Sequence, residues 1–385
     1  MSNRLNSTNN AEKRVRKNTT VVLDGEQISI DIVFKLIQNT DILALAQKLN
    51  MSDIRKLVSS FYQIQRQRIR TNNQVFQFQE RNEECYSMEE LLKFFNSYET
   101  RVQNVMEAWV NLPGNLVAQW CVSNPGIATI LSSGLISNID ITKAPTAGSI
   151  LRYFGQDPTS KWITDEKKLK EIVDTAMRKY DQTNIDNTII TEVCSVMNRS
   201  YDQTANFLIH KKGYDEFDNI AKEDFINSLK LPPYNQECKT LCWKLGESFL
   251  KQKNKVDDIY GKLIDARKVY ENAKNDRGDY VDQAKVCAAH VSMHTQAFKY
   301  YSSGKLSPDH ILSRAKRFAV KIFISHLHAI MYWDHYKALP PRPFAMSILG
   351  HKDYIRIPRS DIVNFPEDEY YTLGTQIGSP KVLID

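Results

Sequence analysis

The stretch CVSNPGIATILSSGLI, residues 121–136, decides how we expect this chain to fold. Residues 115–123 have the apolar spacing of a short helix. Asn124-Pro125-Gly126 then interrupts it, because proline ends a helix and glycine adopts backbone angles that other residues resist. Helical spacing resumes at once, with apolar side chains at Ile127, Ile130, Leu131 and Leu135. This pattern is typical of a helix-hairpin-helix.

A helix-hairpin-helix leaves backbone N–H groups unpaired at the start of its second helix, where they attract anions. We predict that the turn holds a DNA phosphate, through Pro125, Gly126, Ile127 and Ala128. Such a contact would fix the protein on the backbone without reading the base sequence. An ordinary turn between two packed helices explains the same residues equally well.

The composition is that of a globular chain with a mild excess of positive charge. The 385 residues suffice for about two or three domains, and 42% of them are hydrophobic. The net charge of +6 is compatible with a nucleic-acid partner without demanding one. The six cysteines form no CxxC pair, which indicates a reducing compartment and argues against a disulfide scaffold or a zinc ribbon.

The sequence also indicates in which compartment of the cell we expect the protein. Its N-terminus is polar and does not resemble a signal peptide, and no apolar run approaches the ~20 residues that a membrane helix needs. We therefore expect no membrane partner, and a cytoplasmic protein of a bacterial or phage-infected cell.

The fold class that we predict is mainly α: a helical bundle with a helix-hairpin-helix and a small N-terminal β-hairpin. The hairpin is predicted from two apolar runs around Asp24-Gly25, a favoured two-residue turn. Six segments follow from the pattern: a disordered basic arm (1–18), the β-hairpin and long helices (19–112), the helix-hairpin-helix segment (113–162), a helical insertion (163–230), a C-terminal helical region (231–338) and an extended tail (339–385).

Two long amphipathic helices are predicted in the second segment. Ser52 can cap the first, and Ser87 with Glu90 forms the capping box of the second. A polar link joins them, which indicates an antiparallel helical hairpin. The hairpin can mediate a homodimer as a coiled coil, or its apolar faces can pack within one chain.

A second group of candidate DNA contacts lies on the strongest predicted helix, residues 311–336, which Pro308 precedes. Its basic flank carries Arg314, Lys316, Arg317 and Lys321. Cations at helical spacing can grip a phosphate backbone, although a charged helix face is more often only solvated.

No metal site and no cofactor are predicted. The sequence contains no HExxH motif, zinc-finger spacing, phosphate-binding loop or dinucleotide fingerprint. His328 and His335 lie seven residues apart and could share a helix face, but a metal needs three or four converging ligands. Cys238 and Cys242 fall on an apolar helix face, where core packing explains them better than nucleophilic catalysis does.

Two stretches together resemble a known family, the DEDD-type, Piv-like insertion-sequence transposases. The resemblance is to the C-terminal transposase domain of that family, and it is carried by NPGIATILSSGLISNIDITKAPTAGSILRYFGQDPTSKW (124–162) and YNQECKTLCWKLGESFLKQKNKVDDIYGKLIDARKVY (234–270). It implies a helix-hairpin-helix and a serine nucleophile in this domain, for which Ser160 is the candidate. It also implies a nuclease half whose carboxylates bind Mg²⁺ if the protein is catalytically active.

We therefore predict a DNA-binding protein of a phage or mobile element that grips duplex DNA non-specifically. Residues 1–120 are mostly helical in pattern and do not resemble the nuclease half of the family. The first alternative is an active transposase or recombinase, with Ser160 as nucleophile and carboxylates from a nuclease partner chain or from its own N-terminal half, acting with or without a guide RNA. The second is a helical assembly protein that binds no nucleic acid.

Overall fold

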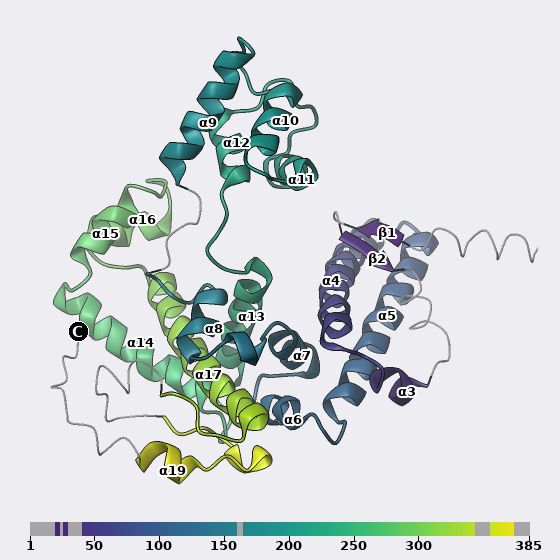
Figure 1. The fold of residues 1–385 in the computed structure, drawn as a ribbon, viewed down its shortest axis with the longest axis vertical. Helices are drawn as coiled ribbons and strands as arrows, with labels where there is room; N and C mark the ends of the chain where they lie inside the picture. Colours follow the sequence, from purple (N-terminus) through teal and green to yellow (C-terminus); the bar gives the residue numbers. More distant parts are fainter. Residues whose placement is uncertain (1–19, 24–25, 30–40, 160–164, 343–354, 373–385) are drawn as a thin grey trace, which may run out of the picture. The chain divides into compact units, whose positions relative to one another are not determined.

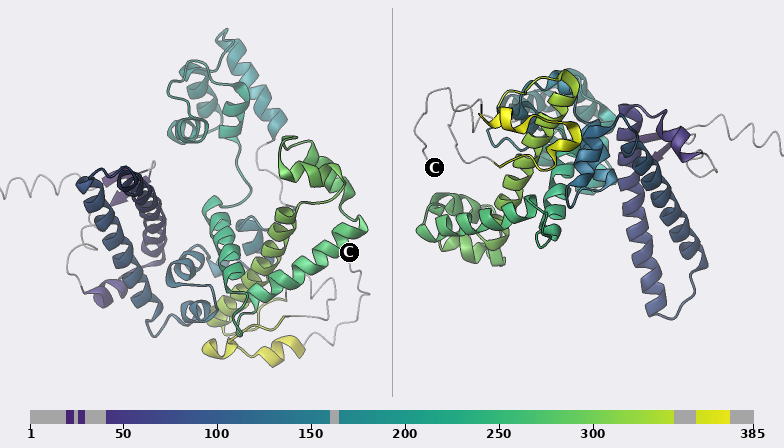
Figure 2. Two further views of the ribbon diagram at one scale, coloured as in Figure 1. Left: turned by 180° about the vertical axis from the view of Figure 1, so that it is seen from behind. Right: turned by 90° about the horizontal axis from the view of Figure 1, so that it is seen from below.

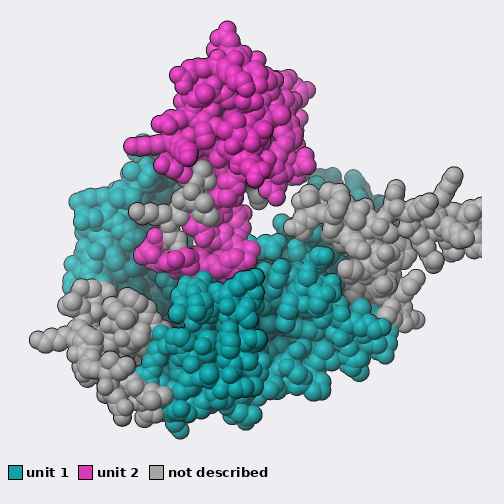
Figure 3. Space-filling model, viewed as in Figure 1, with its two compact units in different colours: residues 1–151, 237–385 teal, residues 152–236 magenta. Residues whose placement is uncertain are grey.

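The computed structural model describes residues 20–23, 26–29, 41–159, 165–342 and 355–372. The chain is mostly helical, as predicted (Figure 1). It divides into two compact units, which are coloured in Figure 3. Unit 1 consists of Met1–Leu151 and Glu237–Asp385, and unit 2 of Arg152–Gln236. The predicted insertion, 163–230, lies within unit 2.

Two short strands come first in the described part of the chain. Strands β1 (Thr20–Leu23) and β2 (Glu26–Ser29) pair antiparallel, with Thr20 opposite Ser29. The turn predicted for them, Asp24-Gly25, lies outside the described residues, so the hairpin itself stays a prediction. The basic arm predicted at 1–18 also lies outside the described residues.

Helices α4 (Met51–Glu80) and α5 (Tyr86–Val110) run side by side within one chain, and α3 (Ile42–Ala46) packs on α5 (Figures 1 and 2). The Ser60 and Tyr98 hydroxyls hydrogen-bond across the pair at 2.6 Å, and Arg68 pairs with Glu99 at 2.6 Å. Both predicted caps are wrong. The Asn50 side chain caps α4 in a capping box with Asp53, and α5 begins after Cys85 with no side-chain cap.

Helices α6 (Leu116–Ser123) and α7 (Thr129–Ser137) follow, with a 3₁₀ turn η1 (Ile141–Lys143) and α8 (Ala147–Tyr153) after them. Helix α7 is buried from Ile130 to Ser137. A Cβ on Gly134 would lie 3.0 Å from Val58 of α4 and 3.3 Å from Leu241 of α13 (Gln236–Gln252). Helix α7 therefore lies between α4 and α13, and glycine is what permits the close approach.

The rest of unit 1 is built around α17 (Pro308–Tyr336), which starts with Ser307 as N-cap and proline at the first helical position. It packs along α14 (Tyr260–Arg277), and α15 (Val281–Ala288) and α16 (Gln296–Ser302) pack on each other. Four buried aromatic rings join the helices at the centre of the unit. The Trp120 and Phe323 rings stack at 5.6 Å, and those of Phe249 and Tyr260 stack at 4.8 Å.

The described end of the chain, 355–372, packs on the rest of unit 1 and contains η2 (Ser360–Val363) and α19 (Glu367–Thr372). Ring nitrogens of three side chains lie within hydrogen-bond distance of its backbone carbonyls. Trp120 donates to the Pro358 carbonyl at 2.7 Å, Trp333 donates to that of Val363 at 3.1 Å, and His326 Nε2 lies 3.0 Å from that of Ile355. The predicted tail is therefore ordered along this stretch, with short helices rather than a purely extended path.

Unit 2 contains α9 (Glu166–Lys179), α10 (Asn187–Val196), α11 (Tyr201–Lys212) and α12 (Lys222–Leu229). These helices share a core of their own, which includes Val173, Ile189, Leu208 and Phe225. Because unit 2 buries its own apolar cluster, it has the internal packing of a separate small domain.

Candidate nucleic-acid interface

The turn between α6 and α7 is closed by its own hydrogen bonds. The buried Asn124 side chain donates to the Trp120 carbonyl at 2.7 Å, and the Ile127 N–H donates to the Asn124 carbonyl at 3.1 Å. Gly126 adopts φ = +93°, which a residue with a side chain rarely accepts. The turn therefore requires glycine at this position, for a local conformational reason.

Gly126 also packs against α13. The Ser248 hydroxyl donates to the Gly126 carbonyl, and a Cβ on Gly126 would lie 3.3 Å from the Ser248 backbone and 3.2 Å from the Gln252 side chain. Ile127 is buried. Of the four residues predicted to hold a phosphate, Ala128 is the exposed one, and it is the residue from which α7 starts.

The start of α7 has N–H groups without a side-chain cap, as the predicted phosphate site requires. Ala128 is the N-cap residue, and because its side chain carries no acceptor, α7 has no side-chain cap. The first N–H groups of α7 therefore carry the partial positive charge of a helix N-terminus. A phosphate oxygen is a suitable partner for such groups.

Two lysines of α13 share the helix face that contacts the turn. Lys244, Ser248 and Lys251 follow i, i+4, i+7 spacing, which places them on one helix face. Ser248 of this face contacts the turn at Gly126, so Lys244 and Lys251 flank that contact. We call this set, the start of α7 with Lys244 and Lys251, the α7–α13 face.

Helix α4 adds a further positive charge beside Lys244. The Lys244 ammonium lies 3.8 Å from the centroid of the Tyr62 ring. Burial lowers the pKa of Lys244, and the nearby Arg66 guanidinium lowers it further. Burial disfavours the charged form of a lysine whether or not an anion is near, so only the Arg66 contribution records a neighbouring positive charge. Arg66 therefore belongs with the α7–α13 face electrostatically.

The four basic residues of α17 that were predicted to contact DNA interact with other groups of the protein. Arg314 pairs with the buried Glu271 at 2.8 Å, and its guanidinium lies 4.6 Å from the centroid of the Tyr280 ring. Lys316 pairs with Glu247 of α13. Arg317 is exposed and donates to the Ser313 carbonyl at 3.3 Å, while Lys321 is half-buried. Arg314 and Lys316 thus already have carboxylate partners.

The structure does not bring the turn and the α17 stripe together. A Cβ on Gly246 would lie 3.3 Å from Lys316, whereas Ser248 contacts Gly126. Residues two apart on an α-helix point to opposite sides, at about 200°. Helix α13 therefore separates Lys316 from the turn. Lys244 and Lys251, which share the α13 face that contacts the turn, were not predicted as site residues.

The catalytic prediction falls outside the part of the chain that can be assessed, because Ser160 is not among the described residues. Among those that are, no group of three or more His, Cys, Asp or Glu is placed to hold a metal ion. Burial lowers the pKa of His326 to about 4 and also lowers that of His328, whose Nε2 lies 3.0 Å from the Ala144 carbonyl. Cys238 and Cys242 are buried, as their apolar helix face predicted.

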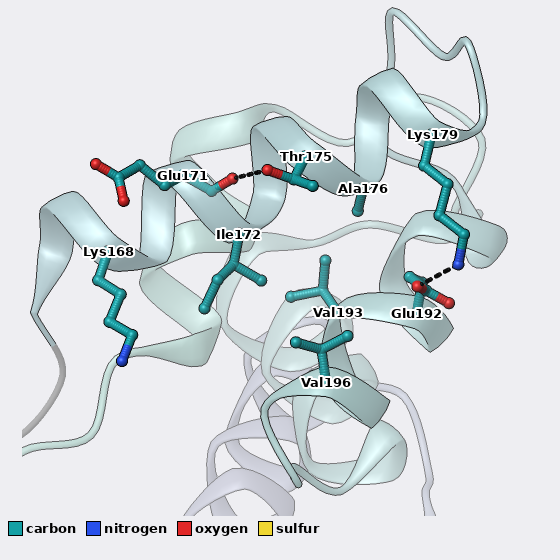
Figure 4. Close-up of a pocket in the computed structure, with 9 residues that line it drawn as sticks. All are labelled: Lys168, Glu171, Ile172, Thr175, Ala176, Lys179, Glu192, Val193 and Val196. Carbon is teal, nitrogen blue, oxygen red and sulfur yellow. Dashed lines mark hydrogen bonds and ion pairs between the residues drawn. The ribbon is translucent and has the colours of Figure 1, made fainter.

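Unit 2 carries a surface hollow of about 330 Å³ between α9 and α10 (Figure 4). Its floor is apolar, with Ile172, Ala176, Val193 and Val196, and Lys179 pairs with Glu192 at its rim at 2.6 Å. The charges on the rim have both signs, so the hollow shows no preference for an anion or a cation.

Comparison with protein-family models, with curated proteins and with solved structures found no match for this chain. In the described residues, no helix has the length and apolar character that crossing a bilayer would require.

Proposed function

We propose that this chain binds the phosphate backbone of DNA through the α7–α13 face, with Arg66 as an additional cation. The resemblance to insertion-sequence transposases supports DNA of a phage or mobile element as the ligand. Contacts of this kind hold the backbone and leave the base sequence unread.

One arrangement carries the proposal: Ser248 of α13 contacts the turn that precedes an uncapped helix start, and the same face of α13 carries Lys244 and Lys251, with which no carboxylate of the described residues forms an ion pair. The helix start supplies directional N–H donors, and the lysines supply net charge. Together they favour an anion at this place over the same anion at an isolated helix end or an isolated lysine.

The test compares Lys244→Gln/Lys251→Gln with the wild type in binding to duplex DNA over a range of salt concentrations. We expect the double variant to bind more weakly, and its salt slope to fall by about two, because each phosphate contact contributes roughly 0.9 to the slope. The matched control is Lys268→Gln/Lys299→Gln, which removes two exposed lysines from α14 and α16. A wild type that does not bind DNA at low salt, or a control that loses as much affinity, contradicts the proposal.

A second function, self-association through the α4–α5 pair, is favoured by the apolar side chains that this pair exposes. They are Ile69 and Phe76 of α4, and Tyr86, Leu91 and Phe94 of α5. Ile69 and Phe76 lie seven and fourteen residues beyond Tyr62, on the face of α4 that Lys244 covers at Tyr62. We propose that a second copy of the chain covers this continuation.

Sedimentation of Ile69→Gln/Phe76→Gln tests the self-association. We expect a wild-type dimer and a monomeric variant, because two apolar side chains of a buried helical seam are replaced by polar ones. Val269→Gln, which changes an exposed apolar residue of α14, should leave the dimer intact. A wild type that sediments as a monomer at every concentration removes this function.

A further inference from the structure

Arg317 of α17 lies beside a carboxylate that other residues already occupy. Arg267 donates to one oxygen of the buried Glu271 at 2.7 Å, and Arg314 donates to the other oxygen at 2.8 Å. The Tyr280 hydroxyl donates to that second oxygen as well. Arg317 is exposed, and no carboxylate of the described residues forms an ion pair with it. Its charge therefore has no acidic partner within the described chain.

The charges of this cluster do not balance. The three guanidinium groups of Arg267, Arg314 and Arg317 lie around one carboxylate, which leaves a formal excess of two positive charges. Partial burial and then the neighbouring Arg314 lower the pKa of Arg317, and Glu271, which raises it, does not restore its usual value. Glu271 therefore does not neutralise Arg317, and an added anion would be attracted to this place.

His310 shares the helix face of these arginines. His310, Arg314 and Arg317 follow i, i+4, i+7 spacing on α17. The Arg317 Nε donates to the Ser313 carbonyl, one turn back, so the guanidinium is turned toward the end of α17 where His310 lies. Burial, then Arg317 and then Arg314 lower the pKa of His310. The contributions of the two arginines require that their guanidinium groups lie near the ring.

His310 and Arg317 both have donors to spare. The Tyr301 hydroxyl of α16 lies 3.2 Å from His310 Nδ1. A neutral imidazole that accepts through Nδ1 carries its proton on Nε2, and this nitrogen has no hydrogen-bond partner among the described residues. Arg317 uses its Nε for the Ser313 carbonyl, which leaves the N–H groups of its two terminal nitrogens for a ligand.

We propose that His310, Arg314 and Arg317, called the Arg317 site below, bind a phosphate monoester. A guanidinium presents a planar pair of N–H donors that matches two phosphate oxygens. A monoester carries close to two negative charges at neutral pH, which matches the excess of the cluster, whereas a phosphodiester or a carboxylate carries one. The site includes no residue of the α7–α13 face, so it does not rest on the proposed function.

Titration of inorganic phosphate at about pH 8, where the dianion predominates, tests the site by ³¹P NMR. We expect the wild type to bind phosphate saturably and Arg317→Gln to bind it about tenfold more weakly, because charge-assisted hydrogen bonds are lost. The matched control is Arg178→Gln of α9, an exposed arginine whose Nε also donates to a carbonyl one turn back. An unchanged unfolding midpoint of Arg317→Gln establishes that the fold is intact.

Three results of this titration would overturn the proposal. They are a wild type without saturable binding, an Arg317→Gln protein that binds as tightly as the wild type, and an Arg178→Gln protein that loses as much affinity as Arg317→Gln does.

A second measurement identifies the source of the phosphate group. Fluorescent oligodeoxythymidine with a 5′-phosphate is compared with the same strand ending in a 5′-hydroxyl. A preference for the phosphorylated strand that disappears in Arg317→Gln identifies the end of a nucleic-acid strand. Equal binding of both strands, with inorganic phosphate still bound, identifies a small phosphate compound.

The same comparison separates this inference from the proposed function. Lys244→Gln/Lys251→Gln should weaken both strands equally and leave inorganic phosphate binding unchanged. Both strands bound as by the wild type would remove the proposed function and leave the Arg317 site in place. Inorganic phosphate binding that is lost in the lysine variant but retained in Arg317→Gln would overturn the Arg317 site.

Discussion

Helices α17 and α13 both carry rows of cations in unit 1, but they differ in what lies opposite those charges. On α17, Arg314 is held by the buried Glu271, and Lys316 by Glu247. On α13, no carboxylate of the described residues forms an ion pair with Lys244 or Lys251, and burial, followed by Arg66, lowers the pKa of Lys244. Positive charge without a local partner is available to a ligand, whereas charge that already has one serves mainly to hold the fold. Three predictions sharpen this contrast.

The largest effect is expected for Glu271→Ala. Glu271 is buried and accepts hydrogen bonds from Arg267, Arg314 and Tyr280. Its removal leaves two guanidinium groups without their partner, and we expect the free energy of unfolding in urea to fall by about 3–5 kcal/mol. Asp276→Ala, which breaks an exposed pair with Lys305, should cost less than about 1 kcal/mol. Equal costs for the two variants would show that the α17 charges are not structural.

The next effect concerns the buried face of α17 and its dependence on pH. Burial lowers the pKa of His326 to about 4, from 6.5 in the unfolded chain. The unfolded state therefore binds a proton at His326 more readily than the folded state does. The stability that neutral His326 contributes is present above pH 6.5 and is lost as the pH falls toward 4. The full difference corresponds to roughly 3 kcal/mol.

Urea unfolding at several pH values measures this contribution. His326→Gln should be less stable at neutral pH, because the Tyr260 hydroxyl at 2.9 Å and the Ile355 carbonyl lose their ring partner. Between pH 6.5 and 4 its stability should fall less steeply than that of the wild type. The same slope in both proteins would mean that His326 does not carry the pH dependence.

The smallest effect on stability is expected for Gly126→Ala, in the turn that α13 contacts. Alanine at φ = +93° is strained, and its Cβ would press on the Ser248 backbone, so we expect a loss of about 1–3 kcal/mol in unfolding free energy. Gly114→Ala is the matched control, since a Cβ there meets nothing within 4 Å. If both variants are equally stable, the turn is not fixed by Gly126. If Gly126→Ala also weakens DNA binding, a change in the turn geometry accounts for it, because the added Cβ would point at Ser248 and Gln252 of α13.

Much of the fold could be predicted from local patterns. The apolar spacing of α4, α5 and α17 is regular over many turns, and each helix appears close to its predicted place. The caps were less predictable. Ser52 and Ser87 satisfied the residue preference, but α4 starts two residues earlier, where the Asn50 side chain reaches the N–H groups of Ser52 and Asp53. Several residues near a helix start can serve as a cap, and packing selects one.

The candidate site was less predictable than the fold. Its turn was found because proline and glycine interrupt a helix in any context. Its lysines were missed because Lys244 and Lys251 look like many other lysines of this chain, and the sequence does not show that Ser248 between them contacts Gly126. Conversely, Arg314 and Lys316 were chosen for a spacing that gives no information about Glu271 or Glu247, which lie 43 and 69 residues away.

The sequence by itself determined that this chain is mainly helical, where its long helices lie, and that a sharp turn follows Asn124. These properties depend on residues within a few turns of one another, so their physical causes lie in the local chain. Only the tertiary structure decided which cations are neutralised, that α13 stands between Lys316 and the turn, and that Arg267 and Arg314 share Glu271. Those properties depend on pairs of side chains from distant segments, and no local pattern encodes which segments meet.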